Sequence, residues 1–196
     1  RPLPRCWNAF TAASSPEMRP LTLAMTAFGP FAGTASIDFR RLGENPLFLI
    51  NGPTGAGKTS ILDAICFALY GETTGGERQG AEMRSHHAAP ELLTEISFEF
   101  ELAGKHYRIR RVPDQERPKA RGEGTTQHKA EAQLDELGAD GSARNLVPRK
   151  VGEANQRVME LTGLDADQFR QVMVLPQGRF RELLLAPSQE RGAIFQ

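Results

Sequence analysis

The sequence predicts an α/β fold of the P-loop NTPase type, joined to antiparallel β-hairpins. A short apolar run leads into a glycine-rich loop at 51–57, and apolar residues at helical spacing follow the loop directly. Before and after this unit, apolar residues alternate with polar ones, as in strands that cover one face of a core. The 196 residues are enough for one domain with a sizeable core.

The first predicted unit is a strand, a turn and a second strand over residues 18–39. Apolar side chains alternate over 21–25, and the alternation resumes over 35–39. Between them, Phe28-Gly29-Pro30-Phe31-Ala32-Gly33 interrupts the pattern with residues typical of turns. Residues 1–17 show no clear period, and we expect them to be a poorly ordered leader.

The next predicted elements are a buried strand and a helix on either side of the glycine-rich loop. Leu47-Phe48-Leu49-Ile50 is a short, continuous apolar run, as expected of a strand buried on both faces. From Lys58 to Tyr70 the apolar side chains recur at helical spacing, and Gly71 stands where a helix would end. The order of strand, loop and helix is the one that a phosphate-binding loop requires.

A hairpin over residues 95–111 can be predicted down to its register. If Ala103-Gly104 forms a two-residue turn, apolar side chains face one another on one side of the hairpin and charged ones on the other. The predicted facing pairs are Phe98 with Ile109, Phe100 with Tyr107, Glu99 with Arg108 and Glu101 with His106.

Three polar segments are predicted to lack regular structure. Residues 71–90 are loop-like, and their Thr74-Gly75-Gly76-Glu77-Arg78 stretch is interpreted as a glycine turn because it directly follows the loop's helix. Residues 113–130 are rich in Pro and Gly, and we expect a mobile excursion there. Leu134-Asp135-Glu136 lacks the apolar run that precedes the acid of a Walker B motif, so we expect a solvated turn.

The last third of the chain carries helix start and stop signals. Leu161-Thr162-Gly163 ends one predicted helix, and Asp165 with Gln168 forms a capping box that opens the next. Val172-Met173-Val174-Leu175 is predicted to be a strand. Ser188 is expected to cap a final helix.

The segment Gly52-Pro53-Thr54-Gly55-Ala56-Gly57-Lys58-Thr59 matches the phosphate-loop pattern GxxxxGK[ST] in full. Small residues let main-chain N–H groups point at a β-phosphate, and the following helix adds its free N–H groups and positive dipole end. The lysine of such a loop reaches the β- and γ-phosphates, and the hydroxyl after it holds Mg²⁺. The predicted nucleotide-binding residues are Asn51, Gly52, Pro53, Thr54, Gly55, Ala56, Gly57, Lys58, Thr59 and Ser60.

Composition narrows the class of protein. The 24 Lys and Arg residues balance 24 Asp and Glu, which excludes a polybasic nucleic-acid binder. Cys6 and Cys66 lie far apart, which argues against a disulfide framework or a zinc site. This cysteine usage suits a reducing cytosol, so we expect a cytoplasmic location. No apolar run approaches the length of a membrane span, so we expect no membrane partner.

Several segments together resemble the SbcC family, the SMC-like ATPase subunits of the bacterial SbcCD nuclease within the ABC-ATPase superfamily. The resemblance covers essentially all of residues 18–196 and no part of the leader. The segments that carry it are LTLAMTAFGPFAGTASIDF, LFLINGPTGAGKTSILDAICFALYGET, the MRS and HAAPE stretch, KHYRIRRVP, and DADQFRQVMVLPQGRFRELLLAPSQER.

The resemblance implies a fold, cofactors and partners. Residues 18–187 would form the amino-terminal half (lobe I) of an ABC/SMC-type ATPase head, and 188–196 would begin a coiled-coil helix. The cofactors would be ATP and Mg²⁺, with Lys58 and Gln177 as catalytic residues and Thr59 and Gln177 on the metal. The partners would be an SbcD-type nuclease subunit, a second copy of the chain in a head-to-head dimer, and double-stranded DNA ends.

The same resemblance implies that ATP binding and hydrolysis gate DNA access to the partner nuclease. Because the signature motif and Walker B motif of the family are missing here, we expect this chain alone to bind ATP weakly and to hydrolyse it negligibly. Two alternatives stay open: a non-catalytic, nucleotide-dependent interaction module and a small P-loop phosphotransferase.

A local basic patch is the candidate for DNA contact. Residues 105–121 hold seven Lys or Arg against two acids, and cations along a hairpin suit phosphate contact. Local ion pairing is the alternative, since Glu99 is predicted to face Arg108. No such partner is predicted for Arg110 and Arg111. The candidate DNA contacts are Arg110, Arg111, Lys119 and Arg121.

Overall fold

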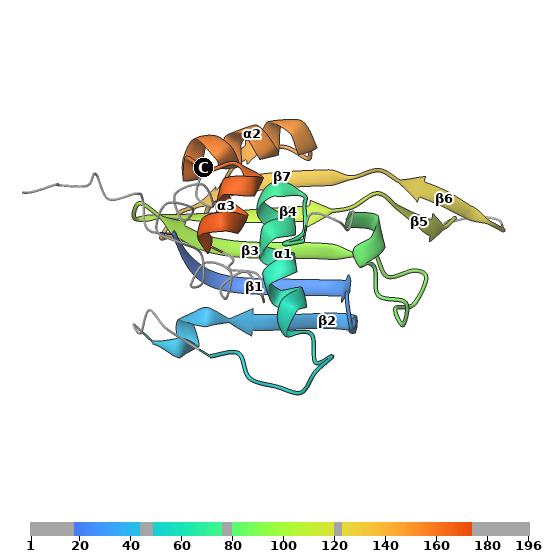
Figure 1. The fold of residues 1–196 in the computed structure, drawn as a ribbon. Helices are drawn as coiled ribbons and strands as arrows, with labels where there is room; N and C mark the ends of the chain where they lie inside the picture. The colour runs from blue at the N-terminus through green and yellow to red at the C-terminus, as the bar shows by residue number, and fades with distance from the viewer. Residues whose placement is uncertain (1–17, 44–48, 76–79, 120–122, 174–196) are drawn as a thin grey trace, which may run out of the picture.

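The computed structural model describes residues 18–43, 49–75, 80–119 and 123–173 (Figure 1). A six-stranded antiparallel sheet of order β2-β1-β3-β4-β7-β8 carries the helices on one face, and a separate two-stranded ribbon, β5-β6, extends from it. The sheet strands are β1 Met18–Phe28, β2 Phe31–Asp38, β3 Glu95–Leu102, β4 Lys105–Val112, β7 Glu131–Leu137 and β8 Ala143–Val147. The ribbon and helices are β5 Gln115–Pro118, β6 Thr125–His128, α1 Lys58–Tyr70, α2 Val151–Thr162 and α3 Ala166–Met173, with short 3₁₀ turns η1 Phe39–Leu42 and η2 Gly80–Met83.

The central hairpin β3–β4 confirms the predicted register, including all four facing pairs. Ala103 and Gly104 both have positive φ, at 50° and 75°, which gives the two-residue turn the twist that a tight hairpin needs. In β3 the apolar side chains are buried and the acidic ones between them are half-buried. Strict alternation therefore fixed both the strand and the face that it buries.

The predicted opening unit of strand, turn and strand is also confirmed. β1 pairs with β2 on one side and with β3 on the other, so β1 lies inside the sheet. The register of β1 with β2 shifts between Thr26 and Phe28, and Ala27 between them has a φ of 48°. This bulge redirects the chain into the turn at Gly29 and Pro30.

The helices begin and end where the sequence signals place them. Gly71 closes α1 with a φ of 80° and a 2.8 Å hydrogen bond from its N–H to Phe67 O, and Gly163 closes α2 in the same way. The capping box that opens α3 is formed in both directions: Gln168 N–H donates to Asp165 Oδ1 at 2.8 Å, and Asp165 N–H donates to Gln168 Oε1 at 3.0 Å.

One hydrophobic core joins the sheet to the helices. α1 packs on β1, β3 and β4, and α2 packs on β7 and β8. Aromatic side chains dominate the centre, with Phe98 and Phe100 stacked at a centroid distance of 5.4 Å. The fully buried side chains that fill the layer between sheet and helices include Leu23, Met25, Phe28, Leu69, Ile96, Ile109, Leu134 and Val158.

A buried guanidinium fastens the carboxyl end of α1 to the sheet. Arg111 on β4 is 2% exposed and donates to Ala68 O at 3.0 Å, to Leu69 O at 3.1 Å and to Asn155 Oδ1 of α2 at 2.7 Å. The acceptors in α1 are the final carbonyl groups of the helix, at the negative end of its dipole. Burial lowers the pKa of Arg111 to about 10, so the group stays charged at neutral pH.

Two predictions about apolar runs are wrong where the structure describes them. Leu47 and Phe48 lie outside the described residues, but Leu49 is 88% exposed and belongs to no strand. Among the described residues the sheet is antiparallel and ends at β2, so it offers no inner position to that run. Val172 and Met173 continue helix α3 instead of starting a strand. The capping box starts the helix, and a short apolar run does not end it.

Two segments predicted to be irregular are strands. Residues 113–130 contain the ribbon β5–β6, paired from Gln115 with His128 to Pro118 with Thr125. Leu134-Asp135-Glu136 lies within β7, where Leu134 is fully buried and Asp135 is 5% exposed. The Asp135 carboxylate accepts from Asn145 Nδ2 at 2.7 Å and from Gln133 Nε2 at 3.0 Å, which explains how the strand buries it.

Within the described part of the chain, none of the helices has the length and apolar character needed to cross a bilayer.

Replacing Arg111 by alanine should destabilise the fold by about 3 kcal/mol, because its buried acceptors would lose their donor. Chemical denaturation with urea measures the loss. Arg108→Ala on the same strand is the matched control: its side chain is 38% exposed and its ion pairs span 3.7 and 4.0 Å. The control should cost under about 1 kcal/mol. Equal losses in the two variants would contradict the structural role assigned to Arg111.

Candidate functional site

The phosphate-loop motif lies at the amino end of α1, as its sequence requires. Gly57 is the residue before the helix and has a φ of 86°, a left-handed conformation that favours glycine. No side chain of the described segments caps this helix end, and its first turn contains no acidic residue. Among the described residues, no carboxylate therefore competes for the first N–H groups of α1, and the helix end suits an anion.

Lys58 is folded back over its own loop. Its ammonium group donates to Gly52 O and to Pro53 O, both at 2.8 Å. These main-chain carbonyl groups hold the charge at the rim of the loop. A phosphate oxygen is a stronger acceptor for an ammonium group than a neutral carbonyl, so the charge is placed where a phosphate can take it over.

The predicted nucleotide-binding residues are consecutive in the chain and end in the first turn of α1. Residues Asn51, Thr59 and 53–56 are exposed, whereas Gly52, Gly57, Lys58 and Ser60 are half-buried. The exposed Thr59 hydroxyl is an oxygen ligand of the kind that Mg²⁺ takes, beside a loop whose amides can hold phosphate. These residues fit a Mg²⁺-nucleotide: the amides of 55–60 and Lys58 for the phosphates, and Thr59 for the metal.

The turn between β1 and β2 supports the loop from behind, which the sequence did not reveal. A Cβ atom on Gly57 would lie 2.8 Å from Pro30 Cγ and 2.9 Å from Phe31 Cζ, so the ring atoms of the turn touch the glycine backbone. A Cβ atom on Gly29 would lie 2.9 Å from Ser60 Oγ. The motif FGPF therefore fits its glycine and proline against the start of α1. The Gly29-Pro30 pair in the turn between the two predicted strands was the available signal.

Gln177, the other predicted catalytic and metal-binding residue, lies outside the described residues. The helix before it, α3, is attached to the carboxyl end of α1. Arg170 donates to Glu72 Oε2 at 2.8 Å and to Thr73 O at 3.2 Å, and the ring centroids of Tyr70 and Phe169 are 5.3 Å apart. The segment that leads to Gln177 thus begins on an element packed against the phosphate-loop helix.

The prediction that Arg110 and Arg111 lack partners is wrong. Arg110 forms a two-pronged ion pair with Glu95 across the hairpin, and this hydrogen bonding raises the pKa of Arg110. Arg111 is the buried clamp on α1 and cannot reach an external phosphate. Both cations are used inside the lobe. Arg111 is therefore excluded as a DNA contact, and Arg110 is neutralised by its neighbour.

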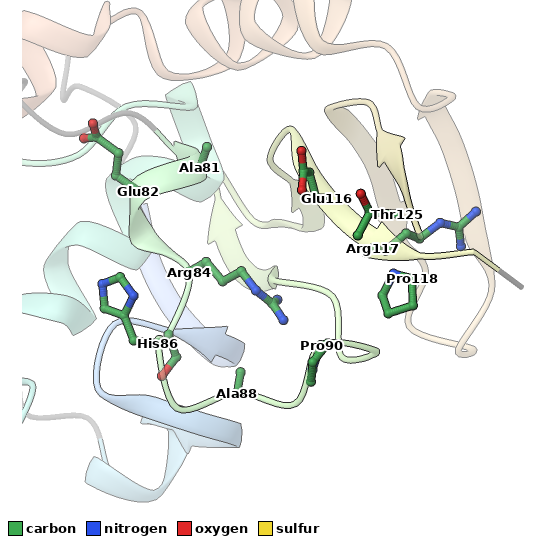
Figure 2. A pocket seen from close by; sticks show the side chains of 11 residues that line it. Ala81, Glu82, Arg84, His86, Ala88, Pro90, Glu116, Arg117, Pro118 and Thr125 are labelled. Carbon is green, nitrogen blue, oxygen red and sulfur yellow. The ribbon is translucent and has the colours of Figure 1, made fainter. Parts of the chain in front are cut away.

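Lys119 remains an exposed cation at the end of β5, and Arg121 lies outside the described residues. A cleft of about 440 Å³ separates the ribbon from the loop over residues 81–90. Figure 2 shows Arg84 pointing from that loop across the cleft toward the ribbon, with Arg117 and Glu116 on the ribbon side. Of the surviving basic candidates, the described one, Lys119, thus lies directly after the ribbon strand β5.

Two other reactive side chains have structural roles. Asp63 on α1 is 8% exposed and accepts from Thr74 N–H at 3.1 Å and from the Thr74 hydroxyl, which places Thr74-Gly75 in the predicted turn. Burial raises the pKa of the Cys66 thiol to about 12, so the thiol is protonated and inert at neutral pH. Neither residue is part of the candidate site.

Comparison with known proteins places these features in a family. A model described as AAA domain matches residues 22–196. The chain is 63% identical over 178 residues to the SbcC protein of the nuclease SbcCD from Vibrio cholerae serotype O1, and 39% identical over 183 residues to the SbcC protein of Lactococcus lactis. Each alignment covers 91% of this chain but only 17% of the relative. The chain therefore spans about a sixth of the length of these relatives.

Among solved structures, a chain from a study of ATP-driven dimerisation and DNA-stimulated activation of SMC ATPases aligns with a TM-score of 0.47 and 16% identity. The alignment covers 90% of this chain and 96% of the other.

Gly57→Ala should lower the melting temperature more than Gly55→Ala does. Both glycines have positive φ, at 86° and 84°, so both variants carry the backbone strain of a left-handed alanine. A Cβ at Gly57 meets Pro30 and Phe31, whereas a Cβ at Gly55 meets nothing within 4 Å. The free energy of unfolding should fall by about 1–2 kcal/mol more in Gly57→Ala than in Gly55→Ala. Differential scanning calorimetry compares the two, and equal melting temperatures would show that the turn does not support the loop.

Proposed function

Because the chain belongs to the AAA-domain family, we propose that it is the ATP-binding lobe of an ATPase subunit in a DNA double-strand-end nuclease complex. One observation carries the proposal: a complete phosphate-loop motif stands at an uncapped helix end with its lysine held at the rim by carbonyl groups. In this proposal ATP binding and hydrolysis gate the access of DNA to a partner nuclease of the SbcD type. The location would be the cytoplasm.

The proposed division of labour follows from the geometry of the loop. The amides of 55–60 bind the β- and γ-phosphates, and Lys58 leaves Gly52 O and Pro53 O to neutralise the phosphate charge. Bound Mg²⁺ supplies charge neutralisation at the phosphates, and the Thr59 hydroxyl is its ligand in this chain. Gln177 would complete the metal site and orient the attacking water.

Assembly is part of the same proposal. A second copy of the protein would pair head to head across the nucleotide. Each phosphate loop would then be completed by residues of the other copy. Within the described residues, the two acids buried at least nine-tenths, Asp63 and Asp135, are both occupied by structural hydrogen bonds. A water-positioning carboxylate is therefore expected from outside this lobe.

Catalysis should require the remainder of a full-length ATPase of this family. We expect residues 1–196 alone to show negligible ATP hydrolysis. A chimaera in which residues 18–196 replace the matching segment of the Vibrio cholerae relative should hydrolyse ATP when assembled with that organism's partner nuclease. Lys58→Ala should reduce its turnover at least about 100-fold, because the phosphate charge loses its closest cation. A coupled phosphate-release assay measures the rate.

Three outcomes separate the candidate functions. Robust turnover by residues 1–196 alone, abolished by Lys58→Ala, would contradict the need for a second half, and phosphoryl transfer in a phosphate-acceptor screen would favour a small phosphotransferase. A chimaera that binds nucleotide and assembles but never turns over would favour a non-catalytic interaction module. ATP hydrolysis by the chimaera, but not by residues 1–196 alone, supports the proposed ATPase lobe.

DNA contact is proposed for Lys119, which directly follows β5, and for Arg121. Replacing Lys119 and Arg121 together by glutamine should flatten the plot of log Kd against log salt by about 0.9 for each lost phosphate contact. The matched control, Lys150→Gln with Arg157→Gln, removes two exposed cations from α2 and the residue before it, and should leave the slope unchanged. Fluorescence anisotropy of a labelled duplex end, titrated with the assembled chimaera at several salt concentrations, measures both slopes. An unchanged slope in the ribbon variant would exclude it from the DNA footprint.

A further inference from the structure

A left-handed alanine stands at the base of the turn that supports the phosphate loop. Ala27 has a φ of 48° and is fully buried, at the point where the register of β1 with β2 shifts. An alanine in this region is held there by its surroundings, and such outliers gather where a chain must be aimed at a functional site. The residues after it, Gly29 to Phe31, are the ones that touch Gly57 and Ser60.

Three hydrogen bonds hold the bulge in place. The Ala27 carbonyl accepts from Ser85 N–H at 2.8 Å and from the Thr94 hydroxyl at 3.1 Å. Gly29 N–H donates to Met83 O at 2.8 Å, just beyond the bulge. The chain is thus fixed on both sides of Phe28 before it enters the turn.

Thr94 is the hub of the buried polar network behind the bulge. It is fully buried, its N–H donates to Gln115 Oε1 at 2.8 Å, and its carbonyl accepts from Gln115 Nε2 at 3.0 Å. Its hydroxyl accepts from Arg84 Nη1 at 3.3 Å. Every polar atom of Thr94 has a partner, so the hydroxyl that reaches Ala27 is held in one direction.

From this arrangement we infer that Thr94 is a positioning residue for the phosphate loop. It acts through the Ala27 bulge, which aims the turn of Gly29, Pro30 and Phe31 at Gly57 and so sets the loop in the shape that binds phosphate. The inference rests on the proposed nucleotide site and adds to it a residue that touches neither nucleotide nor metal. Its link to the loop is a chain of contacts: hydroxyl to carbonyl, bulge to turn, and turn to glycine.

Thr94→Val separates this role from a purely structural one. Valine has nearly the same shape and replaces the hydroxyl by a methyl group. Ala27 O keeps the N–H of Ser85, and Arg84 Nη1 keeps Leu92 O at 2.6 Å and Gln115 Oε1 at 3.3 Å. No buried group loses its last partner, so the melting temperature should stay close to that of the parent.

Nucleotide affinity should nevertheless fall. In the Vibrio cholerae chimaera, Thr94→Val should weaken Mg²⁺-dependent binding of a fluorescent ATP analogue by a factor of about 3 to 10, the size expected for a non-contacting residue in a coupled network. Thr94→Ser keeps the hydroxyl and should bind like the parent. Unchanged affinity in Thr94→Val, with binding lost in Lys58→Ala, would overturn the positioning role and leave the nucleotide site standing. Parent-like binding in Lys58→Ala would instead overturn the nucleotide site itself.

A double-mutant cycle covers the case in which Thr94→Val also lowers the melting temperature. Pro30→Ala removes the exposed ring that touches Gly57 and should weaken binding on its own. If Thr94 acts through the turn, the double variant should bind no more weakly than the weaker single variant. Effects that multiply would show that the two residues act independently, and would overturn the inference.

Discussion

The whole lobe depends on where α1 lies on the sheet, and a buried arginine fixes that position. Hydrophobic contact between α1 and strands β1, β3 and β4 has no direction along the helix axis. The Arg111 guanidinium supplies the direction, because its donors reach the carbonyl groups of Ala68 and Leu69 at the carboxyl end of α1. It also bonds Asn155 of α2, so one side chain joins strand and two helices. The phosphate loop at the opposite end of α1 is placed by the same clamp.

On the outer face of the sheet, acidic side chains neutralise the basic side chains of strand β4. Charged side chains there pair across neighbouring strands: Glu95 with Arg110, and Arg108 with both Glu99 and Asp135. On the opposite face, Glu136 pairs with both Lys105 and Arg144. Each exposed pair contributes little to stability, but together they leave few cations of the described strands free for a ligand. The acidic side chains of β3 therefore largely neutralise the basic side chains of β4. This explains why the ribbon, rather than the hairpin, is the better candidate for DNA contact.

Sequence reasoning succeeded where structure is determined by neighbours in the chain. The hairpin register follows from the Ala103-Gly104 turn, and the helix ends follow from Gly71 and from the capping box of Asp165 and Gln168. It failed where distant residues decide. A polar strand such as β5 is stable because Gln115 bonds the backbone of Thr94, 21 residues earlier. Arg111 broke the rule that exposes arginines, because the acceptors that satisfy it lie 42 and 43 residues away.

In the proposed function, the state of Lys58 prepares the loop for a nucleotide. A half-buried ammonium group without an acceptor would be costly, and a carboxylate partner would repel the incoming phosphate. Two carbonyl oxygens of the loop itself, at 2.8 Å each, avoid both problems. They are neutral, so an anion can displace them, and they belong to the loop that receives the anion. The cation is thus held ready within its own binding site, provided that the loop keeps its shape. That shape is set by the turn pressed against Gly57, so the supporting turn and the lysine belong to one functional unit.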